Sequence, residues 1–444
     1  MEKVNVIGAG LAGSEAAIYL ANNGVSVDLY EMRPKKTTGA HKTDYCAEFV
    51  CSNSLGAVAV TSASGLLKEE IKILGSTLIA EAFNHCVPSG ASLSIDRFGF
   101  SKKITDIIKK HPNINLINKE IDVLPEDGVN IIATGPLTSE ALCKDIIKKT
   151  DSSNFSFFDA IAPIVKKESI NFDKAFYASR WDKGDADFIN CPMTKEEYEN
   201  FYNILTTAET IELKSFEAKA AKFFEGCMPI EVMAKRGVDT LRFGPMKPVG
   251  LFDRRIPTEF KKQQFYVVVQ LRQDDKAAEL YNLVGFQTNL KWGEQKRLIQ
   301  SIPGLENAEI VRYGVMHANT FINSPKILNK TLNTKKDPNL FFAGQITGVE
   351  GYTESIATGL LAGINAYRLI KNLPLVELTN ETMLGALVDY ITYEEHKNFQ
   401  PVNSNWGIVA PMDIDKKIKK DKNQKNTLLA NRSIECIFNI KNVL

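Results

Sequence analysis

Two cysteines that are far apart in the chain lie in irregular sequence of the kind that carries chemistry. Cys51 lies in CAEFVCSNSLG, and Cys227 lies in FFEGCMPIEVMAKRGVDTLRFGPMKPVGL. A thiolate is a strong nucleophile, so such a residue can add reversibly to a substrate. An unperturbed thiol has a pKa of about 8.5 and is mostly protonated at neutral pH. A reactive cysteine therefore needs nearby positive charge.

Basic residues follow Cys227 closely. Arg236, Arg242 and Lys247 lie in the same stretch, and a helix that begins after Pro229 would add the positive end of its dipole. Both features favour a thiolate at Cys227. The other cysteines are predicted to be mainly small buried hydrophobic residues; they are Cys46, Cys86, Cys143, Cys191 and Cys436.

The chain opens with VNVIGAGLAG, a nucleotide-binding signature. Gly8, Gly10 and Gly13 form G-x-G-x-x-G, and these glycines allow a tight turn and close approach of the backbone to a pyrophosphate. Glu31 follows about 20 residues later, where the motif requires an acid that accepts a hydrogen bond from a ribose hydroxyl. The surrounding pattern predicts a strand over 3–7, a helix over 11–23 and a strand over 25–30.

A second cofactor element lies near the other end of the chain, in NLFFAGQITGVEGYTESIATGLLAGINAYRLI. The pattern predicts a buried strand over 340–343, a glycine loop, and a long helix that begins near Tyr352. The N-terminus of that helix could stabilise negative charge, such as that of a reduced flavin. The run NIIATGPLTS (130–139) is typical of the strand and turn that close an FAD-binding domain.

These segments predict an α/β fold: a Rossmann-like FAD-binding domain assembled from both chain ends, with an inserted α+β lobe. The FAD-binding domain would comprise residues 1–145 and 325–444, and the insertion residues 146–324. The run 265–271 in the insertion has strand character. Only one G-x-G-x-x-G is present, so NADPH or NADH would dock without a dinucleotide fold of its own.

The composition excludes some classes of protein. The formal net charge is +1, so any nucleic-acid contact needs a local basic face. The lysine run over 416–425 is one candidate, and a solvated surface helix is the alternative. Seven cysteines without a C-x-x-C pair argue against a metal site and for a reducing, cytoplasmic location. The sequence shows neither an N-terminal signal pattern nor an apolar run long enough to span a membrane.

With these motifs the chain resembles a known family, the folate- and FAD-dependent RNA (uracil-5-)-methyltransferases called TrmFO. The resemblance runs from residue 4 to about residue 407. It is carried by VNVIGAGLAGSEAA, LYEMRP, FVCSNSLG, IIATGPLTSE, FFEGCMPIEVMAKRG, FGPMKPVGL, VVQLRQDD, YGVMHANTF, LFFAGQITGVEGY and NFQPVNSNWG.

The resemblance implies a specific chemistry. FAD, reduced by NADPH or NADH, takes a methylene group from 5,10-methylenetetrahydrofolate, passes it to C5 of a uridine in RNA, and completes the methyl group with a hydride. Cys227 is expected to add to uracil C6. Cys51 is expected to be the thiol on the flavin side that removes the C5 proton or protects the flavin adduct. The division of roles between the two cysteines stays open.

The same resemblance and motifs suggest binding residues, and no metal site. The FAD-binding residues are expected to be Gly8, Ala9, Gly10, Leu11, Ala12, Gly13, Glu31, Met32, Arg33, Ser52, Asn53, Ala133, Thr134, Gly135, Gly344, Gln345, Gly348, Val349, Gly351 and Tyr352. Contacts to folate or RNA are expected at Arg242, Lys247, Arg272, His317, Lys416, Lys417 and Lys420.

The nature of the RNA stays open. Where the family commonly has arginine, this chain has Gly56 and Ala318. Because these positive charges could contact RNA phosphates, their loss leaves the choice of RNA open between a uridine of the tRNA T-loop and one of 23S ribosomal RNA. Two other classes are a small-molecule FAD oxidoreductase, in which the cysteines form a redox couple, and a non-catalytic flavin-bound RNA chaperone.

Overall fold

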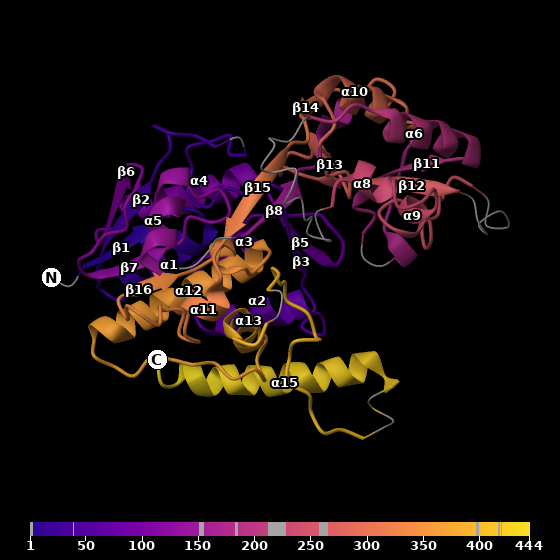
Figure 1. Cartoon of the computed structure of the whole chain (residues 1–444). Coiled ribbons are helices and arrows are strands. Elements are labelled where there is room, and N and C mark those ends of the chain that lie inside the picture. Colours follow the sequence, from indigo (N-terminus) through magenta and orange to yellow (C-terminus); the bar gives the residue numbers. More distant parts are fainter. Residues whose placement is uncertain are drawn as a thin grey trace.

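The computed structural model describes residues 3–38, 40–150, 155–182, 185–211, 228–256, 265–396, 399–415, 418 and 420–444, and only the backbone of 155–160 and 316–318. Figure 1 shows two lobes joined by a strand pair. Among the described residues, no helix is long and apolar enough to cross a membrane. The same residues contain no cluster of metal-ligating side chains.

A five-stranded parallel sheet forms the centre of the larger lobe, here called the parallel-sheet lobe. Its strand order is β16-β7-β1-β2-β6, so a strand from near the end of the chain pairs beside strands from the beginning. Successive side chains of β1 enter different cores, because strand residues alternate between faces. The strands are β1 (Lys3–Ile7), β2 (Ser26–Glu31), β6 (Ile114–Asn118), β7 (Val129–Ile132) and β16 (Leu340–Phe342).

Helices α1 (Leu11–Asn22) and α12 (Tyr352–Ile370) pack against each other beside this sheet. Their close approach depends on small residues. A Cβ atom added at Gly359 of α12 would lie 2.3 Å from the Ala12 carbonyl oxygen of α1. Two segments more than 300 residues apart are thereby held as one unit, as the glycine-rich sequences predicted.

The rest of this lobe surrounds the sheet. A small antiparallel sheet has the order β3-β5-β4, and the long C-terminal helix α15 runs along the lower edge in Figure 1. The elements are β3 (Ser54–Ala57), α2 (Ala63–Ile73), α3 (Thr77–Asn84), β4 (Cys86–Val87), β5 (Ser92–Ile95), α4 (Arg97–Lys110), α5 (Glu140–Thr150), α11 (Ser324–Ile327), α13 (Met383–Thr392) and α15 (Lys422–Lys441).

The second lobe, here called the antiparallel lobe, has a six-stranded sheet in the order β10-β11-β12-β13-β9-β14 and a core of its own. The pair β8 and β15 connects the lobes (Figure 1). The elements are β8 (Phe155–Ala160), β9 (Ile164–Lys166), β10 (Phe176–Ala178), β11 (Phe188–Met193), α6 (Lys195–Thr207), α8 (Ile230–Ala234), α9 (Thr240–Phe243), β12 (Val267–Gln273), β13 (Leu280–Leu283), α10 (Trp292–Gln300), β14 (Ile310–Arg312) and β15 (Met316–Phe321).

The predicted fold class is confirmed: the chain is α/β with a parallel, Rossmann-like sheet. The predicted bounds of the helices and strands differ from the observed ones only by a few residues at their ends. The helix predicted over 11–23 ends at Asn22, and the strand predicted over 265–271 is shifted to Val267–Gln273. Such shifts are expected, because end residues are held by few hydrogen bonds.

Candidate functional site

The glycine loop between β1 and α1 forms an open cradle at the carboxyl end of the sheet. A Cβ atom added at Gly8 would lie 2.6 Å from the carbonyl oxygen of Ala133. One added at Gly13 would lie 1.8 Å from the carbonyl oxygen of Gly8. By contrast, nothing lies within 4 Å of an added Cβ at Gly10. Gly10 is also the N-cap of α1 and offers no side chain to the helix N–H groups. The cradle therefore fits an anion such as a pyrophosphate.

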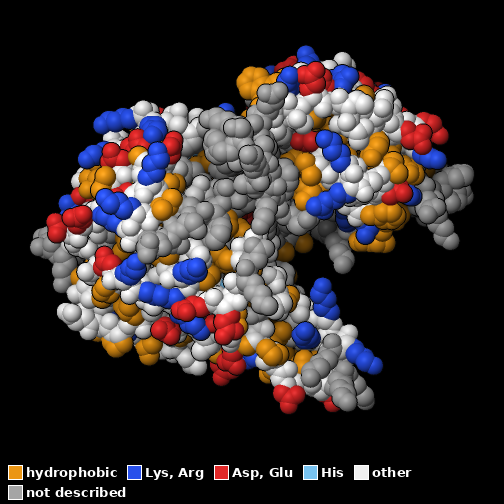
Figure 2. All heavy atoms as spheres, viewed as in Figure 1, with side chains coloured by type: hydrophobic (Ala, Val, Ile, Leu, Met, Phe, Trp, Pro, Cys, Tyr) orange, Lys and Arg blue, Asp and Glu red, His pale blue; other side chains and the backbone are white. Residues whose placement is uncertain are grey.

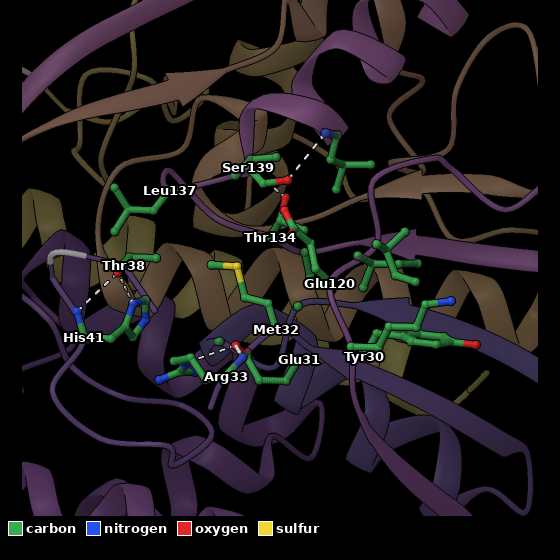
Figure 3. A pocket seen from close by; sticks show the side chains of 18 residues that line it. Tyr30, Glu31, Met32, Arg33, Thr38, His41, Glu120, Thr134, Leu137 and Ser139 are labelled. Carbon is green, nitrogen blue, oxygen red and sulfur yellow. Dashed lines mark hydrogen bonds and ion pairs between the residues drawn. The ribbon is translucent and has the colours of Figure 1, made fainter. Parts of the chain in front are cut away.

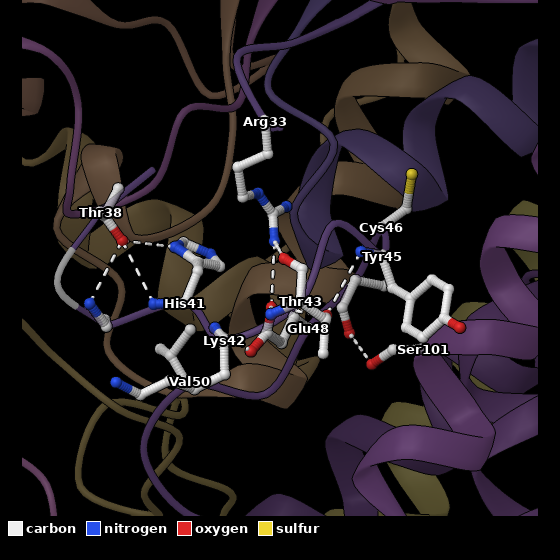
Figure 4. Close-up of polar contacts among 12 residues, drawn as sticks. Arg33, Thr38, His41, Lys42, Thr43, Tyr45, Cys46, Glu48, Val50 and Ser101 are labelled. Atoms are coloured by element: carbon white, nitrogen blue, oxygen red, sulfur yellow. Dashed lines mark hydrogen bonds and ion pairs between the residues drawn. The ribbon is translucent and has the colours of Figure 1, made fainter. Parts of the chain in front are cut away.

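Glu31, at the end of β2, belongs to a buried charge network, and its contact with Arg33 is seen in Figure 3. One carboxylate oxygen accepts a hydrogen bond from Ala9 N at 3.1 Å, and the other accepts one from Arg33 Nε at 2.9 Å. Arg33 is 1% exposed, and its Nη1 also donates to Glu48 at 3.1 Å (Figure 4). Burial alone would raise the pKa of Glu31, but the hydrogen bond and charge of Arg33 outweigh it and lower that pKa. Glu31 thus ties β2 to the glycine loop as an ionised carboxylate.

A hollow lies beside this network, at the ends of β1, β2 and β7 (Figure 3). Gly8, Gly10, Glu31, Met32 and Arg33 line it, together with Ala133 and Thr134. Sequence reasoning missed several lining residues: Thr38, His41 and Glu120, which no motif marks, and Ser139, which ends the run NIIATGPLTS but was not singled out within it.

Two further hollows continue from the first one toward α12. The second shares Gly10, Ala133 and Thr134 with the first, and is also lined by Gly135, Gly344 and Ser355. The third shares Gln345 and Tyr352 with the second, and is also lined by Cys51, Ser52 and Glu350. The three hollows form one path from the glycine loop to Cys51.

The Cys51 loop is anchored to the start of α12. Cys51 N donates to the Tyr352 hydroxyl oxygen at 2.7 Å, across 301 positions of sequence, and the Phe49 and Tyr352 rings lie 4.5 Å apart. Leu55 O, four residues after Cys51, accepts from Lys68 Nζ at 2.7 Å and from the Thr353 hydroxyl at 3.2 Å. These bonds hold Cys51 at the wall of the third hollow.

Three arginines surround the backbone of this loop. Arg97 Nη1 donates to Cys51 O at 3.0 Å, and Arg272 Nη2 donates to Ser52 Oγ at 2.9 Å. Arg312 Nη2 donates to Val50 O at 2.6 Å. Burial, and next the charge of Arg97, lower the pKa of Arg272 to about 10.

One carboxylate, Asp274, pairs with Arg97 at 2.5 Å in the same cluster. The three guanidinium groups therefore outnumber this carboxylate, which favours an anion nearby. The sequence pointed to Arg272 through the motif VVQLRQDD, whereas Arg97 and Arg312 were missed, because nothing in their local sequence indicates a contact with the Cys51 loop.

Not every residue of the predicted FAD set lines the path. Asn53 is buried and donates to Ile95 O and Gln273 O at 3.0 and 2.9 Å. Val349 is buried, and an added Cβ at Gly348 would lie 2.5 Å from the Phe399 ring. The structure places these residues behind the walls of the hollows.

Of the predicted substrate residues that the structure describes, Arg272 lies beside the third hollow through its bond to Ser52, whereas Arg242, Lys247 and Lys420 lie elsewhere. Arg242 lies in the antiparallel lobe, where its guanidinium is 4.3 Å from the Tyr266 ring centre, and Lys247 is exposed in the same lobe. Lys420 is exposed near the start of α15. The other predicted residues lie outside the described part of the chain: Cys227, Lys416, Lys417 and the side chain of His317.

The remaining cysteines only partly match expectation. Cys46 and Cys191 are buried as predicted, and burial raises the pKa of Cys46 to about 11. The prediction is wrong for Cys86, which is exposed. Cys86 is the first residue of the two-residue strand β4, and in this strand Val87 is buried whereas Cys86 faces solvent.

The comparisons with known proteins agree with this geometry. The family described as "Glucose inhibited division protein A" matches residues 3–374. The "Methylenetetrahydrofolate--tRNA-(uracil-5-)-methyltransferase TrmFO" of Bacillus licheniformis is 55% identical over 443 residues, covering 100% of both chains. The protein of the same name from Bacillus mycoides is 56% identical over 440 residues, covering 99% of both.

A solved structure shares the fold. Aquifex aeolicus GidA superposes with a TM-score of 0.70 at 17% identity, covering 99% of this chain and 73% of that chain. At this identity the likeness concerns the fold, whereas the full-length identity to the two Bacillus proteins settles the family. The chain belongs to the glucose-inhibited division protein A family and, within it, to the TrmFO proteins.

Proposed function

We propose that this protein is a folate- and FAD-dependent methyltransferase that acts on C5 of a uridine in tRNA. The observation that carries the proposal is identity of 55% over the full length to a relative named for this activity. The hollows support it, because one path joins a phosphate cradle to a cysteine. We also propose that it works in the cytoplasm, where reduced folates and tRNA occur together.

The chain offers a site of the right shape and chemistry for FAD. The adenosine would lie beside Glu31 and Met32, and the pyrophosphate over Gly10 at the N-terminus of α1. The ring system would reach the third hollow, beside Gly351 and Tyr352. When bound there, FAD would supply the one-carbon carrier and the hydride.

The two cysteines would carry the chemistry on the uracil ring. Addition of the Cys227 sulfur to C6 makes C5 nucleophilic, and C5 then forms a bond to the one-carbon unit. A base would then remove the C5 proton as the bond between the one-carbon unit and its carrier breaks. A hydride added to that carbon would complete the methyl group, and the bond between sulfur and C6 would break to restore the ring. Cys51 is the candidate base or protecting thiol, since it lines the third hollow.

The two lobes would divide this work. Residues 1–145 and 325–444 would bind FAD, and residues 146–324 would present Cys227 and contact RNA. Methylenetetrahydrofolate would enter the third hollow, and NADPH or NADH would reduce the flavin there without a separate dinucleotide fold. A uridine of the tRNA T-loop is the favoured target, and one of 23S ribosomal RNA is the alternative.

The direct test supplies purified protein with FAD, NADPH and labelled methylenetetrahydrofolate. Two RNAs are compared: tRNA lacking 5-methyluridine, and a 23S ribosomal RNA fragment. We expect 5-methyluridine in the tRNA by mass spectrometry, and its loss in Cys51→Ala and Cys227→Ala. Product in the ribosomal fragment alone would move the target to the alternative RNA. Absence of product from both would refute a methyltransferase.

The control is Cys143→Ala. This half-buried thiol on α5, whose pKa burial raises to about 11, should be silent in the assay. RNA containing 5-fluorouracil then separates the two cysteine roles. A covalent adduct should persist in Cys51→Ala and disappear in Cys227→Ala, and the reverse pattern would exchange the roles.

A further inference from the structure

Trp181 adopts a backbone conformation that a bulky residue rarely takes. Its φ and ψ are 59° and 25°, and the next residue, Asp182, has a φ of 50°. The left-handed region is costly for residues with a Cβ atom, and a large side chain there is an outlier. Such conformations persist only where surrounding contacts enforce them, and they concentrate at functional sites.

Specific contacts enforce this conformation. Trp181 N donates to Gly250 O at 2.7 Å, and Arg254 pairs with Asp182 at 3.1 Å. The preceding Arg180 donates to Val249 O at 2.6 Å and to Lys247 O at 2.8 Å. The loop is thereby fastened to segment 247–250, which belongs to the FGPMKPVGL motif.

The contacts hold the indole ring outward. A Cβ added at Gly250 would lie 2.7 to 2.8 Å from three ring atoms of Trp181, so one face of the ring rests on the Gly250 backbone. The side chain is nevertheless 59% exposed. An apolar ring is thus presented to solvent on a rigid support, where an ordinary fold would bury it.

The neighbouring chain is basic. Residues 235–255 contain six basic and two acidic residues, and Lys247 and Arg254 are exposed. Another exposed ring, Phe243, lies in the same segment at 72% exposure, with Arg242 over it at 5.7 Å. Figure 2 shows hydrophobic and basic side chains side by side on this lobe, near α8 and α9. Exposed aromatic rings among arginines and lysines suit unpaired nucleotides, since bases stack on the rings and phosphates pair with the cations.

We propose that Trp181 is a stacking platform for an unpaired base of the RNA substrate, and that segment 235–255 holds the adjoining phosphates. The proposal deepens the proposed function and rests on it. It places one RNA contact on the antiparallel lobe, in the loop that is fastened to the segment following Cys227. A rigid platform there would orient an unstacked loop nucleotide before the target uridine reaches Cys227.

The chain provides a matched control, Trp292. It is also 59% exposed and lies in the antiparallel lobe, but it starts α10 and stacks on its own neighbour Tyr313 at 5.3 Å. In Figure 1, α10 lies at the upper edge of the lobe and α9 at the lower edge. The third tryptophan, Trp406, is half-buried against the core of the parallel-sheet lobe.

The first experiment uses the full-length W292F/W406F variant, in which Trp181 is the sole indole. We expect saturable quenching of its fluorescence by tRNA. The second experiment measures Kd for Trp181→Asn, since asparagine tolerates the left-handed backbone and should fold. We expect binding about 5- to 100-fold weaker in Trp181→Asn, partial retention in Trp181→Phe, and no change in Trp292→Ala.

Gly250→Ala gives an independent check, because the added methyl group would displace the indole. It should weaken binding as Trp181→Asn does. Wild-type affinity in Trp181→Asn, or unchanged Trp181 fluorescence at saturating tRNA, would overturn the platform while leaving the methyltransferase proposal intact. Failure of the wild-type protein to bind or methylate any RNA would instead overturn the proposed function. Concentration-dependent self-association lost in Trp181→Asn, with RNA binding unchanged, would assign the surface to a second copy.

Discussion

Replacement of Arg33 by methionine should destabilise the parallel-sheet lobe and release its flavin. Arg33 is 1% exposed and lies between Glu31 and Glu48, whose side chains are each 8% exposed. Methionine has a similar length but no charge, so the variant would leave two buried carboxylates without their shared cation. Glu31 also holds Ala9 N, and the damage would therefore reach the glycine loop.

The size of the effect follows from the remaining contacts. Breaking a buried ion pair by removing one partner costs about 3 to 5 kcal/mol. Glu48 keeps hydrogen bonds from Lys42 N, Thr43 N and the Thr43 hydroxyl, which favours the lower end of this range. A loss of about 3 kcal/mol raises the unfolding constant by roughly 150-fold and moves a urea midpoint by about 1 M.

The pH dependence gives the reasoning a second readout. In the wild type the pKa of Glu31 is lowered, so its contribution is present above the unfolded pKa of about 4.5 and is lost as pH falls below it. In Arg33→Met the unpaired carboxylate would take up a proton more readily. The stability gap between variant and wild type should therefore narrow as pH falls from 7 toward 4.5.

The assay combines urea unfolding, followed by circular dichroism, with the flavin absorbance retained after gel filtration. The double variant E31Q/R33M is the matched control, since it removes one of the stranded charges and should recover part of the midpoint. An Arg33→Met protein that unfolds at the wild-type midpoint, or a gap that widens at low pH, would refute the role of the bridge.

Three further predictions follow from the same structure. Gly13→Ala should abolish flavin retention while leaving the antiparallel lobe folded, because its Cβ would meet Gly8 O at 1.8 Å; wild-type absorbance at 450 nm would contradict this. Burial raises the pKa of Glu70 to about 7, so the wild type should lose stability as pH rises from 4.5 to 7. The Tm of Glu70→Gln should therefore rise relative to that of the wild type over this pH range. A Tm difference that stays constant with pH would argue against the raised pKa. Arg272→Met should slow methyl transfer about tenfold or more in single-turnover assays, because Arg272 donates to Ser52 beside Cys51. Tm should stay near that of the wild type, because among the described residues no carboxylate lies within salt-bridge distance of Arg272. Unchanged turnover would exclude a role near the thiol.

Local sequence patterns predicted the parallel-sheet lobe well. The glycines at 8, 10 and 13 gave the turn and the helix start within one residue, because only glycine tolerates the close contacts at positions 8 and 13. The same holds for α12, whose start at Tyr352 follows Gly351, a glycine with a φ of 118°. Patterns of this kind depend on neighbours in sequence and can be read from them.

The partners of the functional residues could not be predicted in this way. Nothing near Arg33 in the sequence marks Glu48 as its second partner, since the connecting loop is irregular. Arg97 and Arg312 reach the Cys51 loop from α4 and β14, across 46 and more than 250 positions. The motif around Asn53 likewise does not reveal that its side chain is buried and donates to Ile95 O and Gln273 O.

By itself, the sequence determined the nucleotide-binding βαβ unit, the second glycine loop with its helix, and the family to which the chain belongs. Backbone stereochemistry and the hydrophobic period act over a few residues, so these features can be predicted without knowledge of the fold. Only the tertiary structure decided that Cys51 is tied to Tyr352, that three arginines converge on its loop, and that Trp181 is held outward in a left-handed conformation. These arrangements arise where loops from distant strands meet, and the packing of the whole chain sets which groups face one another there.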